Sequence, residues 1–313
     1  MKKKTSSGRP GGRKPGAPVV KKATARDWIA GARLRTLPLA IAPVIVGTAA
    51  AYVLGVNGEF HWRRALLALV VSLAIQIAVN FANDYSDGVR GTDAHRVGPS
   101  RLTGSGAAKP RTVLTVALVF FGIAAVAGLV LAIGTGYYWL IAVGAVCIVA
   151  AWFYTGGKRP YGYNALGELF VFVFFGLVAT AGTTYVQTGT VSLESWVGGA
   201  AIGFFACAVL LANNLRDLEQ DKLAAKRTLS VLIGSRASRI LFGVFMILPF
   251  VILVGFGLVY MNTGFTYLVL MLALPAVLIV ATAKTPREFV LALQLASLSS
   301  LAYALLLGFA IAF

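Results

Sequence analysis

The chain has few charged residues, few cysteines and no phosphate-binding loop of the Gly-x4-Gly-Lys-Ser/Thr type. Only 12% of its 313 residues are charged, against about 25% in an ordinary soluble domain. Its two cysteines, Cys147 and Cys207, lie in different apolar stretches, and we interpret them as small packing residues. These shortages exclude an ordinary cytosolic enzyme, and the missing loop leaves a P-loop ATPase unsupported.

Apolar residues dominate instead, at 58% of the chain with a mean hydropathy of +0.81. Helices rather than barrel strands are expected, because the apolar stretches are long and do not alternate. The sequence therefore predicts an all-α polytopic membrane protein with nine transmembrane helices, near residues 38–56, 65–83, 112–133, 138–155, 165–187, 193–213, 240–260, 265–283 and 289–312.

The basic residues indicate how these helices cross the membrane. With nine spans, 26 of the 28 Lys and Arg residues fall on one side and only Arg63 and Arg64 on the other. Because basic loops stay in the cytoplasm, this asymmetry predicts a cytoplasmic N-terminus. Residues 1–24, rich in Lys, Arg, Gly and Pro, are predicted to be a disordered tail suited to an anionic inner leaflet. No nucleic-acid-binding module follows them, and residues 25–313 form the transmembrane domain.

Acidic residues are scarce, and their positions point to chemistry. Five of the six Asp residues lie in two short segments that follow the second and sixth predicted spans. The first segment places its polar residues at i, i+3, i+4 and i+7, which is one helix face. The second has a similar spacing, so each set extends a membrane helix: Asn80, Asn83, Asp84 and Asp87, then Asn213, Asn214, Asp217 and Asp221.

Carboxylates one helical turn apart repel one another, so the two faces suggest a cation held between them. Oxygen ligands without His or Cys favour Mg²⁺ over Zn²⁺. Basic residues share the same predicted cytoplasmic loops, and Mg²⁺ beside Arg and Lys is a usual environment for a diphosphate. Those residues are Arg90, Arg96, Arg101, Lys158, Arg159, Arg216, Lys222, Lys226 and Arg227.

A third segment, 154–163, is a Gly- and Pro-containing turn with three tyrosines, Tyr154, Tyr161 and Tyr163. It lies between two spans on the same predicted side and could cap the site, although tyrosines are also common at membrane interfaces. Glu168 follows it, near the cytoplasmic end of the next helix, and an ionisable group there is a functional candidate.

Together these motifs resemble the UbiA-type intramembrane aromatic prenyltransferases. The resemblance rests on Asn-Asp-Tyr-Ser-Asp (83–87), Gly-Thr-Asp (91–93), Tyr-Thr-Gly-Gly (154–157), Asn-Asn-Leu-Arg-Asp (213–217) and Lys-Arg-Thr-Leu (226–229). It runs from about residue 26 to the end and is closest to actinobacterial members. Tyr-Thr-Gly-Gly and Arg-Val-Gly-Pro (96–99) point to the branch that prenylates 1,4-dihydroxy-2-naphthoate in menaquinone synthesis. Two positions depart from the pattern: Leu34 stands where Pro is expected, and Ala225 where Gly is frequent.

The resemblance implies a bacterial plasma-membrane enzyme that joins a polyprenyl diphosphate to the naphthoate. The allylic C–O bond ionises with the help of Mg²⁺, the ring attacks, and CO₂, a proton and pyrophosphate are lost, giving demethylmenaquinol. It implies catalytic roles for Asp84, Asp87, Asp217, Asp221, Lys158 and Tyr154, and Mg²⁺ ligands among those four Asp residues with Asn80 and Asn213. It implies substrate-binding roles for Asn80, Asn83, Arg90, Arg101, Asn213, Arg216, Lys226, Arg227, Tyr161 and Tyr163.

The prenyl tail needs only an apolar groove, because it gains little hydrophobic energy on leaving lipid. We expect this groove beside the Phe-rich fifth span, at Phe170, Phe172, Phe174 and Phe175.

Three alternatives are kept. A CDP-alcohol phosphatidyltransferase also uses intramembrane Asp motifs, but the Ala-Arg expected soon after Gly88 is missing. A cation transporter would have acidic residues near the bilayer midplane rather than at one interface. Prenyltransferases for 4-hydroxybenzoate, homogentisate, haem or a sugar acceptor share the Asp motifs.

Overall fold

The computed structural model describes residues 22–55, 61–92 and 101–313. The predicted tail up to residue 21, Asp93 and the segment 96–99 lie outside these described residues. Within them every regular element is a helix, and the single β-type contact is an isolated bridge between Asn164 and Arg227. The predicted all-α class is therefore confirmed.

Seven helical segments of the described chain are long and apolar enough to cross a membrane. They are α3 (Trp62–Arg90), α4 (Pro110–Thr135), the continuous α6–η4–α7 segment (Gly167–Thr188), α8 (Leu193–Arg216), α10 (Leu229–Gly257), the η5–α11 segment (Met261–Thr282) and α12 (Pro286–Ala312).

Two further segments complete the set of apolar helices. The pair formed by Ala25–Thr36 and α2 (Pro38–Leu54) bends by 45° and counts as an eighth candidate if taken as one span. The ninth predicted stretch contains α5 (Leu140–Phe153), a shorter apolar helix. A helix thus lies in each predicted stretch, while length and composition alone identify seven or eight spans.

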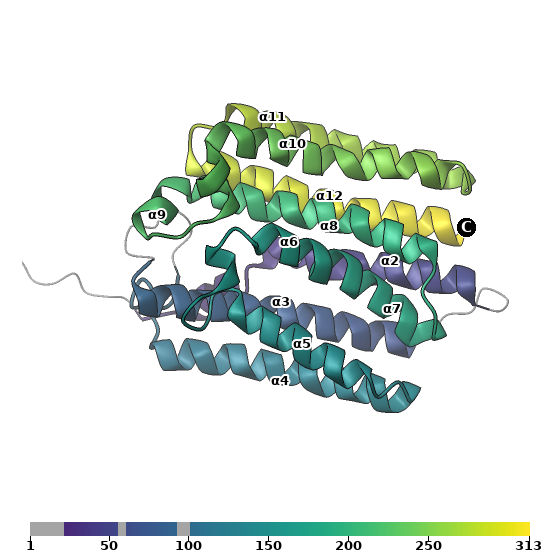
Figure 1. Ribbon diagram of the computed structural model, residues 1–313, viewed down its shortest axis with the longest axis horizontal. Coiled ribbons are helices and arrows are strands. Elements are labelled where there is room, and N and C mark those ends of the chain that lie inside the picture. Colours follow the sequence, from purple (N-terminus) through teal and green to yellow (C-terminus); the bar gives the residue numbers. More distant parts are fainter. Residues whose placement is uncertain (1–21, 56–60, 93–100) are drawn as a thin grey trace, which may run out of the picture.

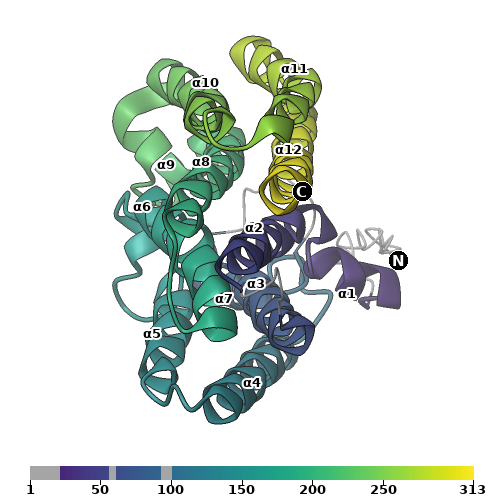
Figure 2. The same ribbon diagram turned by 90° about the vertical axis from the view of Figure 1, so that its right-hand side faces the viewer.

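The long helices run side by side (Figure 1). The short helix α9 (Leu218–Leu223) and the start of α4 lie at one end of the bundle, and the C-terminus lies at the other. In Figure 2, α8, α10, α11 (Leu270–Thr282) and α12 gather on one side, α3, α4, α5 and α7 (Ala179–Thr188) on the other, and α2 lies between.

The two polar motifs lie at the α9 end of this bundle. They are held there because α3 and α8 remain helical beyond the ends of their apolar stretches. Helix α3 continues about two turns beyond the predicted end at residue 83 and stops at Gly91, whose φ of +74° is a left-handed conformation that glycine adopts without strain. Helix α8 continues to Arg216, and Asp217 forms the break before α9. Asp84 and Asp87 are thereby helical.

Helix α8, which carries most of the second motif, packs through a buried aromatic cluster. The rings of Phe205, Phe250 and Tyr303 meet edge to face between α8, α10 and α12. The Tyr303 hydroxyl donates to the backbone carbonyl of Pro249, 2.8 Å away within α10. Edge-to-face pairs contribute about 0.5–1.5 kcal/mol each beyond the burial of their area, so this cluster holds α8 firmly in place.

Candidate active site

A cavity of about 340 Å³ runs along the inside of the bundle. On α3 its lining residues begin at Ala68 and end at Asp87, a distance of about 28 Å at the rise of an α-helix. The part far from α9 is mainly apolar, and Phe170, Phe174 and Phe175 of the predicted groove are among the residues that line the cavity. Phe172 is not among them, because its ring packs on Phe204 with 4.9 Å between centroids.

Polar groups from both motifs meet at the α9 end of this cavity. The structure brings together eleven of the residues predicted for the site, from α3, the loop before α4, the 154–163 segment and the α8–α9 region. They are Asn80, Asn83, Asp87, Arg101, Tyr154, Tyr161, Tyr163, Asn213, Asp217, Asp221 and Lys226.

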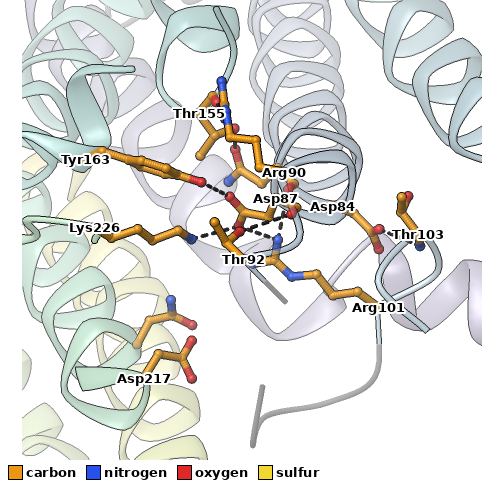
Figure 3. Close-up of polar contacts among 12 residues, drawn as sticks. Asp84, Asp87, Arg90, Thr92, Arg101, Thr103, Thr155, Tyr163, Asp217 and Lys226 are labelled. Carbon is orange, nitrogen blue, oxygen red and sulfur yellow. Dashed lines mark hydrogen bonds and ion pairs between the residues drawn. The ribbon is translucent and has the colours of Figure 1, made fainter. Parts of the chain in front are cut away.

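Asp87 is the centre of the first cluster (Figure 3). It is 2% exposed, and its Oδ2 lies 2.5 Å from Nη1 of Arg101 and 3.1 Å from Nζ of Lys226. The Tyr163 hydroxyl donates to its other oxygen. A buried carboxylate needs such partners, because an unpaired charge in a low-dielectric site costs several kcal/mol. Asp87 thus draws together three segments distant in sequence.

Tyr163 links the two motifs. Its ring packs under the Lys226 ammonium, with 4.7 Å from Nζ to the ring centroid, and under the Arg90 guanidinium, at 5.4 Å. Its backbone carbonyl accepts from the N–H of Arg227, 3.0 Å away. Burial, followed by the charge of Asp87, raises the pKa of the Tyr163 phenol well above its ordinary value. Tyr163 therefore stays protonated at neutral pH and donates to Asp87.

We expect Tyr163→Phe to lower kcat/KM by about tenfold, because it removes the hydroxyl donor to Asp87 and keeps the ring for both cations. Steady-state kinetics of the purified protein measure the effect. Tyr138→Phe, at a tyrosine that is 64% exposed, is the matched control and should leave kcat/KM unchanged. A Tyr163→Phe value within twofold of the wild type would contradict the role of this hydroxyl.

The structure places Asp84 apart from the other carboxylates predicted to bind metal. Its two carboxylate oxygens accept from the backbone N–H groups of Leu102 and Thr103, at 2.9 and 2.8 Å. Figure 3 shows it directed toward Thr103, away from Asp217, and it does not line the cavity. The physical reason is its place on α3, about 60° around the helix from Asp87, where the loop before α4 packs. Asp84 holds the loop that carries Arg101.

Four more predicted residues do not line the cavity either. Arg90 donates to the backbone carbonyls of Thr155 and Gly157, so it connects the 154–163 segment to α3. Arg216 contacts Asn213 and Asp217 of its own motif. Lys158 and Arg227 are exposed side chains, and the structure gives neither a place among the cavity-lining residues.

The second motif is organised around Arg216. This buried guanidinium contacts both oxygens of Asp217, at 2.8 Å from Nε and 2.5 Å from Nη2. Its Nη2 also donates to Oδ1 of Asn213, 2.8 Å away. Asp221, in α9, accepts at its backbone carbonyl from the N–H of Lys226. The chain therefore turns back at this point, which places the Lys226 ammonium beside the Asp87 carboxylate.

Ala225, where the resemblance favours glycine, has a φ of +54° in this turn. That is a left-handed conformation, so the preference for glycine has a conformational cause.

Several polar residues of the cavity were not assigned a role in the site from the sequence. Gln76 extends the polar face of α3 by one turn toward the membrane interior, and it donates to Thr36, 2.9 Å away. Its spacing of four residues from Asn80 was the available signal. Thr155 donates to Asn83 at 2.6 Å. Arg33, with a φ of +53°, and Thr36 also line the cavity, and both belong to the segment 32–38 before the first predicted span, which supports the resemblance to the family without assigning them a role.

The oxygen donors fit a magnesium ion that is shared with a phosphate ligand. Three carboxylates, Asp87, Asp217 and Asp221, line one cavity beside two cations. Among the described residues, no three His, Cys, Asp or Glu side chains form a preformed metal cluster. Mg²⁺ is usually bound by one or two carboxylates together with substrate phosphates rather than by an all-protein cage. The arrangement is compatible with that mode.

Fold and site together define an all-helical, multi-pass membrane protein with an acidic and basic site at one end of a long apolar cavity. Residues 41–289 match the model of the UbiA prenyltransferase family. The chain belongs to this family.

Relatives with curated names cover two thirds or more of the chain. It is 48% identical over 294 residues to the 1,4-dihydroxy-2-naphthoate octaprenyltransferase of Mycobacterium tuberculosis, which covers 92% of this chain and 97% of the relative. The protein of the same name from Escherichia coli is 39% identical, and the match covers 68% of this chain and 70% of that relative. A UbiA homolog from Archaeoglobus fulgidus, bound to DMAPP and Mg²⁺, shares the fold with a TM-score of 0.56 and 14% identity, covering 89% and 98%.

Proposed function

We propose that this chain transfers a polyprenyl group from a polyprenyl diphosphate to 1,4-dihydroxy-2-naphthoate, releasing CO₂ and pyrophosphate and giving demethylmenaquinol. The observation that carries the proposal is the cavity, which extends about 28 Å along α3 from a mainly apolar end to buried carboxylates and cations. Such a shape suits a long apolar tail with an anionic head. The acceptor comes from the curated relatives, which are 1,4-dihydroxy-2-naphthoate octaprenyltransferases.

The diphosphate binds at the polar end. Arg101 and Lys226 supply positive charge there, and the amide groups of Asn83 and Asn213 can donate to phosphate oxygens. Asp87, Asp217 and Asp221, with the oxygen of Asn80, would hold Mg²⁺. When bound, this ion offsets the charge that develops on the departing pyrophosphate. Asp84 contributes indirectly, because it binds the backbone of Leu102 and Thr103 in the loop that positions Arg101.

The reaction is an aromatic substitution. The allylic C–O bond breaks and its electron pair leaves with pyrophosphate, and the ring carbon that bears the carboxylate then forms the new C–C bond. Departure of CO₂ returns an electron pair to the ring. Tyr154, Tyr161 and Tyr163 line this part of the cavity, and their ring faces can stabilise the allylic cation.

The proposal includes the membrane arrangement: nine spans, a cytoplasmic N-terminus and the site at the cytoplasmic face of a bacterial plasma membrane. It is supported by the basic residues, 26 on the site's side and two on the other. The basic tail would then face the anionic inner leaflet.

A direct assay tests the proposed reaction. Purified protein with Mg²⁺, a polyprenyl diphosphate and 1,4-dihydroxy-2-naphthoate should release equal amounts of CO₂ and pyrophosphate, and excess EDTA should stop both. The stoichiometry follows because one decarboxylation accompanies each transfer. If the protein prenylates 4-hydroxybenzoate and leaves the naphthoate untouched, the proposed acceptor is wrong.

A further inference from the structure

Glu168 is a buried acid that the proposed reaction leaves unused. It lies at the start of α6 (Gly167–Val171), is 5% exposed, and its Oε1 accepts from Nδ2 of Asn214, 2.9 Å away. Its Oε2 is buried and has no hydrogen-bond partner among the described residues. Burying a carboxyl group in this way is costly. A structural reason alone would favour an apolar residue here, so the role of Glu168 lies in its contact with Asn214.

Asn214 lines the cavity, and Glu168 fixes the direction of its amide. Because the carboxyl Oε1 accepts, the side of Asn214 that meets it is the NH₂ group. The carbonyl oxygen of Asn214 is then the amide atom left for a cavity ligand. The neighbouring Asn213 has the opposite orientation, since its oxygen accepts from Arg216, which can only donate.

The first motif repeats this division. Asn80 donates its NH₂ group to the backbone carbonyl of Ala32, 3.0 Å away, which leaves its oxygen. Asn83 accepts from the Thr155 hydroxyl, which leaves its NH₂ group. The two amide donors, Asn83 and Asn213, each lie four residues before an Asp of the polar end, so they suit the anionic diphosphate. The oxygen of Asn214 does not suit a diphosphate, because this oxygen accepts hydrogen bonds and the oxygens of an ionised diphosphate can only accept them too.

The surroundings of Asn214 indicate a hydroxyl donor on an aromatic ring. Val209 and Leu210 line the cavity on the same helix. The ring of Tyr154 lines it too and packs against Gly167, where a Cβ would lie 3.5 Å from the tyrosine Cε2. An apolar wall with one aromatic face and one hydrogen-bond acceptor fits a phenol, whose ring stacks while its O–H donates.

We propose that Glu168 is a positioning residue for acceptor recognition: it holds Asn214 so that the amide oxygen accepts a hydrogen bond from a phenolic hydroxyl of the aromatic acceptor. The inference rests on the proposed function for the presence of a phenolic acceptor. It assigns the recognition of that hydroxyl to Asn214, and the orientation of Asn214 to Glu168.

Two substitutions in the full-length chain test the inference by steady-state kinetics. Glu168→Gln keeps an oxygen that can accept from Asn214, so its KM for 1,4-dihydroxy-2-naphthoate should stay within about threefold of the wild type. Glu168→Leu removes that oxygen and should raise this KM by about tenfold or more, as expected for an unsatisfied buried polar group. The KM for the polyprenyl diphosphate and the half-saturating Mg²⁺ concentration should not change.

A double-mutant comparison keeps the test decisive if a single substitution perturbs folding. Glu168→Leu combined with Asn214→Leu replaces the polar pair by an apolar pair and should raise the naphthoate KM no more than Asn214→Leu alone. The probe for the hydroxyl is a naphthoate with one hydroxyl methylated, used as a competitive inhibitor. The wild type should bind one such ether about tenfold more weakly than the parent, and Asn214→Leu should remove the difference.

Several results would overturn the inference. Equal losses in Glu168→Gln and Glu168→Leu would mean that an ionised carboxylate is needed. A change in the Mg²⁺ requirement would make Asn214 a metal ligand, and additive effects in the double mutant would separate the two residues. The wild-type assay judges the proposed function separately: if the acceptor is 4-hydroxybenzoate, the same variants are compared on that phenol.

Discussion

Replacing Asp217 with asparagine is expected to lower kcat by about a hundredfold to a thousandfold. Asp217 lines the polar end of the cavity, and it is proposed to hold Mg²⁺ with Asp87 and Asp221. Pre-organised groups that stabilise a developing charge are worth about 10²–10³ in rate each. Loss of this carboxylate removes such a group and also leaves the buried Arg216 without its counterion. Radiolabelled prenyl transfer at saturating substrate and Mg²⁺ measures the change.

The control for Asp217→Asn is Glu219→Gln, which makes the same chemical change on the exposed surface of α9. Glu219 pairs with Lys222 there, and its side chain is 70% exposed, so kcat should remain at the wild-type value. Thermal unfolding of the purified protein separates lost chemistry from lost folding. If correctly folded Asp217→Asn keeps a tenth or more of the wild-type kcat, the proposed metal site does not include this residue.

Arg101→Met is expected to lower kcat/KM by about a hundredfold. Arg101 contacts Asp87 at 2.5 Å and the backbone carbonyl of Asn83 at 2.8 Å, and with Lys226 it supplies the positive charge of the cavity end. Breaking one partner of a buried pair typically costs about 3–5 kcal/mol, because the remaining charge is left uncompensated. The variant therefore loses a positive charge that would stabilise the departing pyrophosphate. It also leaves the buried Asp87 carboxylate without one of its counterions. Kinetics over a range of polyprenyl diphosphate concentrations measure the loss.

Asp84→Ala should reproduce the Arg101→Met defect in part, since Asp84 holds the loop that carries Arg101. Combining the two changes should add little to Arg101→Met alone. Lys109→Met, at an exposed position of the same connection, removes an equal charge and should have no effect. A raised Mg²⁺ requirement in Asp84→Ala but not in Arg101→Met would restore Asp84 to the metal ligands.

Much of the fold could be predicted because membrane helices follow directly from hydropathy. Each of the nine apolar stretches contains a helix. Their ends were less predictable at the polar motifs, since α3 runs on to Arg90 and α8 to Arg216. There the residues are polar but buried against other segments, and burial by neighbours is not visible in local hydropathy. The same applies to Gln76, whose polar partner Thr36 lies 40 positions earlier in the chain.

The sequence by itself determined the apolar helices and the two polar motifs that are recognisable as UbiA-like. These depend on composition and helical periodicity, which are local properties. Only the tertiary structure decided which side chains reach the cavity: Asp87 does, and Asp84, on the same helix face, holds a loop. It also decided which amide atom each Asn presents, because that depends on partners such as Glu168 and Arg216 that come from packing rather than from spacing.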